Sequence, residues 1–376
     1  MNRVDLLFDA RCFRMSGIGR YIKGELSLLG FKIPGASPDF PTPEEPPRSV
    51  GILCRSEDAP GFIEAGCENT VVWEARAFSF KEQFFSSLLL GKTLKMTDTV
   101  WFPHWNVPMV FSKPKGVEMI LTVHDLIPWT FPAYAKSMKS RLGWPIFLNA
   151  VRSADVIRCV SKATRDVLLE KVPEARNKKT EVRYPNVLPP FLNDPAFRRT
   201  LWEKPWPEKW HFEKGQYALY VGNLKPHKGV DFLLDVWQEV QAELPLTARL
   251  VLAGKSFGEE IPERIEKTPK AVGIGEVTDE ELWQLYANAK VFCFPSFAEG
   301  YGIPPLEALA LGTMTMTSGI PSVNEVLGQE AGIPLVVNLW AERLLETFFM
   351  KQYSEEDSNG SAFTRCTPPE SLEATR

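Results

Sequence analysis

The sequence predicts an α/β protein made of two units, each with a parallel β-sheet covered by helices. Short and almost uninterrupted apolar runs alternate with helical patterns along most of the chain, which is typical of parallel sheets covered on both faces. A Pro-rich segment at 188–215 interrupts this alternation, which then restarts. The length of 376 residues also exceeds the size, about 250–300 residues, at which single cores stop growing.

The first predicted domain covers residues 1–187. Its apolar runs predict strands at 4–8, 50–53, 71–73, 100–102, 119–123 and 156–160. Apolar residues at helical spacing predict helices at 18–29, 81–94, 138–152 and 162–171. The prolines between positions 34 and 47 predict an irregular loop within this domain.

The segment 188–215 is predicted to be a Pro-rich linker, and the second domain covers residues 216–352. Its strands are expected at 217–221, 250–253, 291–295 and 313–317. Its helices are expected at 230–240, 280–289, 306–311 and 339–350. Residues 353–376 are polar and without periodicity, so they are expected to be a disordered tail.

Composition narrows the class of protein. Apolar residues make up 44% and charged residues 24%, as in soluble globular proteins, and the net charge of −4 gives no basic field for nucleic acid. The N-terminal apolar run is too short for a signal peptide, and no run reaches the roughly 18 residues of a membrane span. Six scattered cysteines favour buried free thiols over disulfides. We therefore expect a cytoplasmic protein, and a location at the inner face of the membrane stays open as an alternative.

The densest chemical signal lies at residues 294–308. A strand ends there, a loop with Gly300 and Gly302 follows, and Pro304 or Pro305 opens a helix. Free N–H groups at the helix start and two glycines make a cradle for an anion. Two carboxylates, Glu299 and Glu307, are expected to face the same cleft, where one could bind sugar hydroxyls and the other a ribose. The alternative is that Glu307 only complements the helix dipole and Glu299 is solvated.

The spacing of Glu299 and Glu307, with seven residues between them, resembles the signature of family 4 retaining glycosyltransferases of the GT-B fold. Other segments match this family in the same order: GIGRY (17–21), FPH (102–104), HDL (124–126), YVG (220–222) through KG (228–229), GEV (275–277) and EVLG (325–328). The resemblance covers about residues 4–330 and implies two Rossmann-like domains facing each other across a deep cleft. Within the family, the chain looks most like bacterial enzymes that build surface polysaccharides, many of them mannosyl- or rhamnosyltransferases.

The resemblance implies a role for each matching residue. The catalytic group would be His124, Glu299 and Lys228. The donor diphosphate and sugar would contact Gly17, Gly19, Asn223, Lys225, His227, Gly300, Tyr301, Gly302 and Ile303. Ribose and base would contact Glu307, Gly275 and Val277, and the acceptor side would hold His104, Asp125 and Arg20.

One position departs from the family pattern. Many members have Arg where this chain has Asn223. Either His227 or Lys225 replaces that cation, or phosphate binding is weaker.

Two motifs also have structural explanations. His124 follows a predicted strand at its carboxyl end, where α/β sheets bind ligands, although a lone His is often a structural residue. The glycines at 17 and 19 allow close approach of a diphosphate or acceptor, or simply a tight turn. Asp125 could orient its loop or His124. Ser161 is predicted to be the N-cap of the helix at 162–171.

No D-x-D motif and no zinc-type His/Cys spacing occurs, so no metal and no cofactor are expected, and the nucleotide sugar is a substrate. The expected partners are a nucleotide-sugar donor and a saccharide or lipid-linked saccharide acceptor. Aromatic residues of the first half are expected to be core or loop packing, with a peripheral membrane contact as the alternative: Trp101, Trp105, Trp129 and Phe131.

The predicted activity is retaining transfer of a hexose from a nucleoside-diphosphate sugar to an acceptor hydroxyl. A catalytically weak or inactive nucleotide-sugar-binding protein of the same fold is the alternative. Asn223 and the short C-terminal part keep this alternative open. A third hypothesis, a hydrolase or epimerase on the same fold, has no distinctive support in the sequence.

Overall fold

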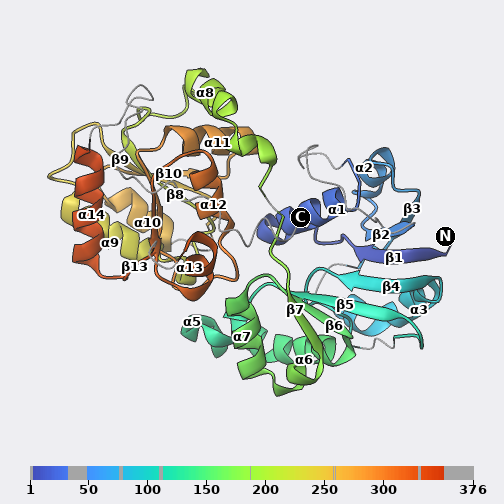
Figure 1. Cartoon of the computed structure of the whole chain (residues 1–376). Helices are drawn as coiled ribbons and strands as arrows, with labels where there is room; N and C mark the ends of the chain where they lie inside the picture. Colours follow the sequence, from blue (N-terminus) through green and yellow to red (C-terminus); the bar gives the residue numbers. More distant parts are fainter. Residues whose placement is uncertain are drawn as a thin grey trace. The chain divides into compact units, whose positions relative to one another are not determined.

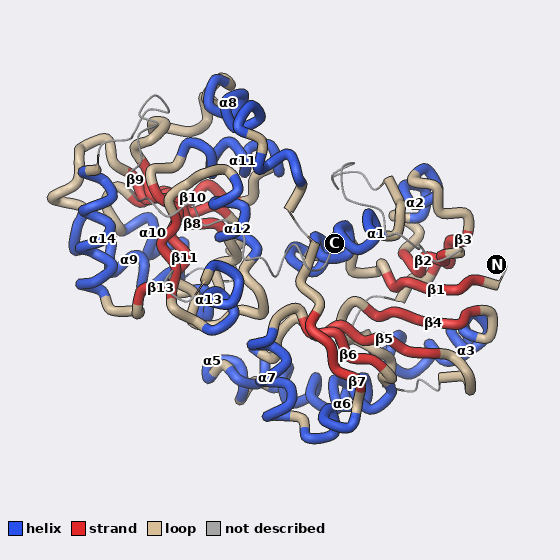
Figure 2. Tube along the Cα trace, viewed as in Figure 1, coloured by secondary structure: helices blue, strands red, loops and turns tan. Residues whose placement is uncertain are grey.

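The computed structural model describes residues 3–32, 49–75, 79–109, 113–186, 188–256, 258, 260–328 and 332–350. The chain divides into two compact units, Met1–Pro190 and Phe191–Arg376. Each unit contains one sheet with helices beside it (Figure 1 and Figure 2). The predicted Pro-rich loop at 34–47, Cys366 and the predicted tail at 353–376 lie outside the described residues.

The first unit is built on a seven-stranded sheet in the order β3-β2-β1-β4-β5-β6-β7. Its strands are β1 (Val4–Asp9), β2 (Val50–Cys54), β3 (Asn69–Val72), β4 (Thr97–Phe102), β5 (Glu118–Val123), β6 (Val156–Cys159) and β7 (Lys179–Val182). Every neighbouring pair is parallel. Because β1 lies between β2 and β4, the strand order reverses there, and the loops that follow β1 and β4 flank the place where such sheets bind ligands.

The helices of the first unit follow the expected alternation. They are α1 (Ser16–Leu28), α2 (Ala59–Glu64), α3 (Phe80–Leu94), α4 (Ile127–Thr130), α5 (Pro132–Ala135), α6 (Met138–Ser153), α7 (Lys162–Lys171) and the 3-10 helix η1 (Pro173–Asn177). Serine hydroxyls cap α3, α6 and α7 by accepting a hydrogen bond from a first-turn N–H group, which fixes where these helices begin. Ser161 is therefore an N-cap, as predicted.

The second unit contains a six-stranded parallel sheet in the order β10-β9-β8-β11-β12-β13. Its strands are β8 (Tyr217–Val221), β9 (Arg249–Ala253), β10 (Ala271–Gly275), β11 (Val291–Phe294), β12 (Thr315–Ser318) and β13 (Gly332–Ile333). Its helices are α8 (Pro195–Glu203), α9 (Val230–Val240), α10 (Glu260–Lys267), α11 (Asp279–Asn288), α12 (Ile303–Ala310), α13 (Pro321–Leu327) and α14 (Val337–Phe349), with the 3-10 helices η2 (Pro190–Asn193) and η3 (Pro226–Lys228). Here the order reverses between β8 and β11.

Each unit has its own apolar core. In the second unit, α9 and α14 cover one face of the sheet, where Trp237 and Trp340 are fully buried. In the first unit, α6 and α7 pack Phe147 and Leu168 against β5 and β6. Burying each of these large apolar side chains stabilises the fold by about 1.5–3 kcal/mol, so each sheet is stabilised within its own unit.

Two sequence expectations need correction, and one is confirmed. The segment 188–215 is more than a linker, because it contains α8, which packs on α11 and begins at Pro195 after the cap Asp194. Helix α1 begins at Ser16 and not at 18, so the glycines at 17 and 19 lie in its first turn. Trp101 is buried, and Trp105 and Trp129 pack against the core, as expected for structural aromatics.

The cysteine prediction is confirmed within the described residues. The thiols there are free and buried: Cys12, Cys54, Cys67, Cys159 and Cys293. None of the helices in the described part of the chain combines the length and apolar character that a membrane span requires.

Candidate active site

Two loops of the second unit meet at the place where its strand order reverses. Residues 222–229 follow β8, and residues 295–302 follow the neighbouring strand β11. The N–H group of Phe297 donates a hydrogen bond of 2.8 Å to the carbonyl oxygen of His227. Gly229, with φ of 71°, lies so close to the second loop that a Cβ there would overlap the carbonyl oxygen of Pro295. The two loops therefore form one continuous rim at the carboxyl edge of the sheet.

Two predicted catalytic residues, Lys228 and Glu299, contact each other on this rim. The ammonium nitrogen of Lys228 lies 2.6 Å from Oε1 and 2.8 Å from Oε2 of Glu299. The hydroxyl of Ser296 donates a further hydrogen bond of 2.7 Å to Oε1. The two charged side chains are 17% and 9% exposed, so the pair is largely shielded from water but open at one side.

The neighbouring residues decide which cations this rim can offer. Burial, with help from Lys228 and Lys225, lowers the pKa of His227 to about 3. His227 is therefore neutral at pH 7. Whether His227 or Lys225 replaces the missing cation, or phosphate binding is weaker, stays a prediction. The Asn223 carbonyl oxygen accepts a hydrogen bond of 2.9 Å from the Tyr220 hydroxyl, whose pKa is raised by burial and by the Glu299 carboxylate.

The start of α12 completes the rim. Gly302 precedes the helix with φ of 101°, a conformation that favours glycine, and no side chain caps the helix. Pro304 and Pro305 in the first turn have no N–H group, so the first-turn donors of this helix are few. Among the other predicted donor contacts, Gly300 and Tyr301 are buried and Ile303 is half-buried.

The predicted ribose and base residues have distinct surroundings. Glu307 is 3% exposed, and its Oε2 accepts a hydrogen bond of 3.1 Å from the Tyr286 hydroxyl. Its carboxylate is therefore held beneath α11, away from bulk water. Gly275 is exposed, with φ of 69°, and its carbonyl oxygen accepts the N–H of Gly254 at 2.8 Å, while Val277 is half-buried. Their contacts with a ribose or a base stay predictions.

In the first unit, His124 lies at the carboxyl end of β5. Its Nε2 donates a hydrogen bond of 2.8 Å to the carbonyl oxygen of Pro103, because a carbonyl can only accept. Burial lowers the pKa of His124 to about 4, so the ring is neutral at pH 7 and Nδ1 carries a lone pair. The ring of Tyr21, on α1, meets the His124 ring edge-to-face at 4.8 Å. This contact brings the GIGRY motif and the HDL motif together.

The remaining predicted residues of the first unit are the acceptor-side candidates Asp125 and Arg20 and the predicted donor contacts Gly17 and Gly19. Asp125 accepts the N–H of Ile127 at 2.9 Å, so it orients its own loop, one of the two roles expected for it. Arg20 is half-buried. Gly19 touches the backbone of Phe13, where a Cβ would overlap a carbonyl oxygen, whereas a Cβ on Gly17 would meet open space. Gly19 is thus required by packing, and Gly17 leaves the helix start accessible.

A buried polar network lies behind these residues and was missed by sequence reasoning. The guanidinium of Arg11 donates two hydrogen bonds, of 2.8 and 2.7 Å, to Asp9 and a third to Glu82. Both carboxylate oxygens of Glu82 accept from the Asn106 amide, at 2.9 and 2.8 Å. Burial works to raise the pKa of Asp9, but Arg11 and His104 outweigh it and hold that pKa below its usual range.

His104 belongs to this network. It is 2% exposed, its Nδ1 accepts the N–H of Asn106 at 3.1 Å, and its Nε2 lies 3.3 Å from an oxygen of Asp9. His104 is thus enclosed by this network, and its predicted contact with an acceptor stays a prediction. The signal that could have found the network is Asp9, a carboxylate at the carboxyl end of an apolar strand.

Within the described residues, no group of three His, Cys, Asp or Glu side chains is placed to hold a metal ion. Whether the reaction proceeds without metal stays a prediction.

Comparison with known proteins identifies the family. The model "Glycosyl transferases group 1" matches residues 203–346, and the model "Glycosyltransferase Family 4" matches residues 52–187, so that together they cover more than half of the chain. The chain belongs to the family 4 glycosyltransferases. This confirms the family predicted from the spacing of Glu299 and Glu307, while the role of each residue stays a prediction.

Curated members of the family include bacterial mannosyltransferases. The O-antigen chain mannosyltransferase B of Escherichia coli is 29% identical over 231 residues, which are 59% of this chain and 58% of that protein. The O-antigen chain mannosyltransferase RfbU of Salmonella typhimurium is 28% identical over 257 residues, 63% of this chain and 67% of that protein. The serotype-specific mannosyltransferase WbdA of Escherichia coli is 36% identical over 123 residues, and the match spans 31% of this chain but only 15% of that protein.

Solved structures show the fold. HepE of Anabaena, crystallised with UDP and glucose, aligns with a TM-score of 0.63 at 15% identity, over 92% of this chain and 89% of that chain. Sucrose-phosphate synthase from Thermosynechococcus elongatus aligns with a TM-score of 0.61 at 17% identity, with the same coverage. The fold is therefore GT-B with two Rossmann-like units, as predicted.

Proposed function

We propose that this protein transfers a hexose, with mannose as the first candidate, from a nucleoside-diphosphate sugar to a saccharide hydroxyl with retention of configuration. The observation that carries the proposal is the Lys228–Glu299 pair on the rim where the strand order of the second sheet reverses. Family membership and the names of the curated relatives support the choice of reaction and of mannose.

The rim suits a departing diphosphate. Lys228 and Lys225 supply positive charge, and the first-turn N–H groups of α12 supply donors where negative charge develops. In the proposed step, the bond between the anomeric carbon and the diphosphate oxygen breaks. The bond between that carbon and the acceptor oxygen forms on the same face, and the departing phosphate oxygen takes the acceptor proton. No protein nucleophile is needed for this step.

Glu299 has a double task in this proposal. Without donor, its carboxylate holds the Lys228 ammonium in place. When the diphosphate arrives, Lys228 turns to the phosphate oxygens, and the freed carboxylate accepts hydrogen bonds from hydroxyls of the donor sugar. Such charge-assisted hydrogen bonds are about twice as strong as neutral ones, so the exchange links recognition of the sugar to recognition of the diphosphate.

His124 would act from the first unit. Because its Nε2 is used by Pro103, only Nδ1 can face a substrate, as an acceptor for a sugar hydroxyl. A neutral ring at this position adds no positive charge next to a reacting carbon that itself becomes positive. We infer that the acceptor binds to the first unit and the donor to the second.

The test is a product assay with GDP-mannose and UDP-glucose as donors and an α-linked mannobiose as acceptor. We expect transfer by the wild-type chain with an α-linked product, and a loss of at least about a hundredfold in kcat/KM for Lys228→Ala and Glu299→Ala. Lys267→Ala, which changes an exposed lysine of α10, is the control and should keep full activity. Transfer by both site variants at the wild-type rate would contradict the site assignment.

A second candidate function is binding of nucleotide sugars without transfer. It is favoured by Asn223 and by the neutral state of His227, which together leave fewer cations for the leaving group. Calorimetric titration with GDP and UDP separates the two functions. Binding of a nucleotide sugar together with no product over long incubation would support this second function.

A further inference from the structure

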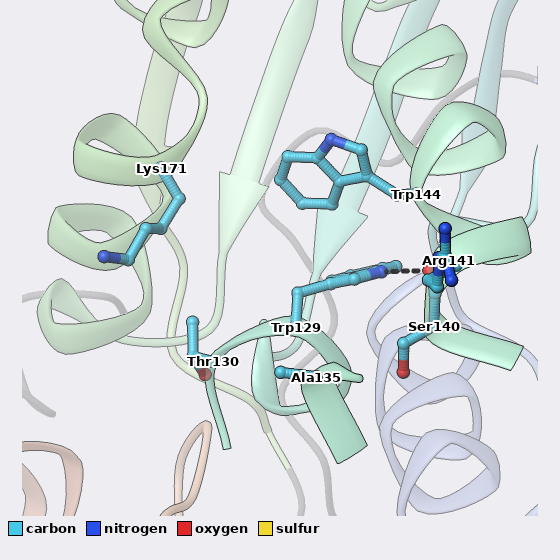
Figure 3. A pocket seen from close by; sticks show the side chains of 7 residues that line it. All are labelled: Trp129, Thr130, Ala135, Ser140, Arg141, Trp144 and Lys171. Carbon is cyan, nitrogen blue, oxygen red and sulfur yellow. Dashed lines mark hydrogen bonds between the residues drawn. The ribbon is translucent and has the colours of Figure 1, made fainter. Parts of the chain in front are cut away.

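The first unit contains a surface pocket that the proposed reaction does not use. Figure 3 shows its lining: Trp129, Thr130, Ala135, Ser140, Arg141, Trp144 and Lys171. The residues come from α4, α5, α6 and the end of α7. Its volume of about 440 Å³ lies within the range of small-ligand pockets, roughly 300–1,000 Å³.

The pocket lies close to the predicted reaction centre along the chain and in space. Helix α4 begins three residues after His124. Helix α7 begins beside the same histidine, because the Thr164 hydroxyl donates a hydrogen bond of 3.1 Å to the His124 carbonyl oxygen. From Thr164 to Lys171 the helix rises about 10 Å. A ligand in the pocket would thus lie some sugar units away from a group bound at His124.

Two indole rings form a rigid wall of the pocket. The Trp129 indole N–H donates a hydrogen bond of 2.8 Å to the Ser140 carbonyl oxygen, shown as the dashed line in Figure 3. Phe147 stacks on Trp129 with ring centroids 4.7 Å apart, and Trp144 meets Trp129 at 5.2 Å. Both indoles therefore pack against Phe147, which restricts their rotation.

The polar groups at the pocket mouth are suited to hydroxyls. Arg141 is exposed and lines the pocket, and its guanidinium carries five N–H donors. The Lys171 ammonium, at the opposite side in Figure 3, is bound to Glu170. A pyranose ring has an apolar C–H face and an edge of hydroxyls. An indole wall beside a guanidinium matches both parts.

We propose that this pocket binds a sugar unit of the acceptor chain, beyond the unit that receives the transferred hexose. This inference rests on the proposed function, because it names a second contact for the same acceptor. It makes the protein select acceptors by length: a chain that reaches the pocket binds better than one that fills only the reaction centre.

A membrane surface is the competing occupant. Met138 and Leu142 on α6 are both 65% exposed, near basic side chains such as Lys139. These two apolar side chains do not line the pocket, and a flat lipid surface needs no hollow between indoles. The concave lining therefore favours a saccharide.

The experiment compares KM for two acceptors, α-methyl mannoside and an α-linked mannotetraose, in variants of the pocket. Arg141→Ala and Trp144→Leu should raise KM for the tetrasaccharide about tenfold and leave KM for the monosaccharide and kcat unchanged. Lys139→Ala, an exposed cation on the same helix outside the pocket, should change neither value. An equal change for both acceptors, or none, would overturn the proposal. Arg141→Ala decides the matter if Trp144→Leu does not fold.

Two further arms separate the sources of failure. If no transfer is detected, the proposed function fails, but titration of the tryptophan fluorescence with mannotetraose still tests the pocket, and Arg141→Ala should weaken that binding about tenfold. If instead the pocket variants lose binding to vesicles of phosphatidylglycerol and phosphatidylcholine while tetrasaccharide binding is unchanged, the pocket serves the membrane and the proposal is wrong.

Discussion

At the scale of single residues, the contact between Lys228 and Glu299 determines what a nucleotide must displace. We predict that Glu299→Gln abolishes most transfer but binds free GDP or UDP about tenfold more tightly, because the carboxylate no longer competes with the diphosphate for the Lys228 ammonium. Calorimetric titration of both proteins measures this difference. Weaker nucleotide binding by Glu299→Gln than by the wild type would mean that the pair does not exchange partners.

Two neutral histidines give a defined dependence of stability on pH. His124 and His227 have pKa values lowered to about 4 and about 3, so below pH 6.5 the unfolded chain binds protons that the folded chain does not. Stability therefore falls as pH drops from 6.5 toward 4, by up to about 1.4 kcal/mol per pH unit for each histidine.

Urea unfolding between pH 7 and pH 5 tests this dependence. His227→Gln removes one of the two groups, so its free energy of unfolding should fall less steeply than that of the wild type. Parallel curves for the two proteins would show that His227 takes up a proton in the folded state.

At the scale of elements, the two rim loops can approach each other only because position 229 lacks a side chain. Gly229 and Gly275 have nearly the same φ, 71° and 69°, but only at Gly229 would a Cβ overlap backbone. We expect Gly275→Ala to cost about 1–2 kcal/mol through its backbone conformation alone. Gly229→Ala should cost at least about 2 kcal/mol more. If chemical denaturation gave the same loss in free energy of unfolding for both variants, the two loops would be able to separate without an energetic cost.

The network around Arg11 ties the end of β1 to α3 and to the loop after β4. Removing the guanidinium in Arg11→Ala leaves the carboxylates of Asp9 and Glu82 buried without a cation, and we predict a loss of about 3–5 kcal/mol. Arg3→Ala breaks an exposed pair with Asp98, which water and salt screen, so its loss of stability should be far smaller than that of Arg11→Ala. Similar losses in the free energy of unfolding of the two variants would mean that water reaches the carboxylates of the network.

The sequence predicts the elements well where one periodicity dominates. The bounds of β8, α9 and α7 agree to the residue with the predictions. A buried strand is recognisable as a run of apolar residues, and an amphipathic helix as apolar residues that recur at helical spacing. Helix α8 was not predicted, because a proline such as Pro195 usually interrupts regular structure. Here Pro195 follows the cap residue Asp194 and occupies the first position of the helix, where proline is favoured. The edge strand β10 contains two glycines, and pairing with β9, not local preference, makes it a strand.

The site was predictable only where local motifs carry it. Lys228 and Glu299 stand in loops that the strand pattern already places at one sheet edge. The neutral state of His227 depends on burial by residues far away in the sequence, so no motif could reveal it. The same holds for Glu82 and Asn106, which reach Asp9 and Arg11 from separate elements.

At the scale of the whole molecule, two units with separate cores carry complementary parts of one proposed reaction. The second unit presents cations, N–H donors and a carboxylate at the reversal of its strand order. The first unit presents a neutral histidine at the carboxyl end of β5, next to the strand β4 that flanks its own reversal, with an indole-lined pocket about 10 Å along α7. This division explains why the family signature is spread over segments from 17 to 328.

The central claim is that the rim with Lys228 and Glu299 binds the diphosphate of a nucleotide sugar. Calorimetric titration with GDP-mannose and UDP-glucose tests it most directly, in the wild type, in Lys228→Ala and in the control Lys267→Ala. We expect saturable binding of at least one donor by the wild type and the control, and at least about tenfold weaker binding by Lys228→Ala. Binding of equal strength in all three proteins, or of neither donor by any of them, would contradict it.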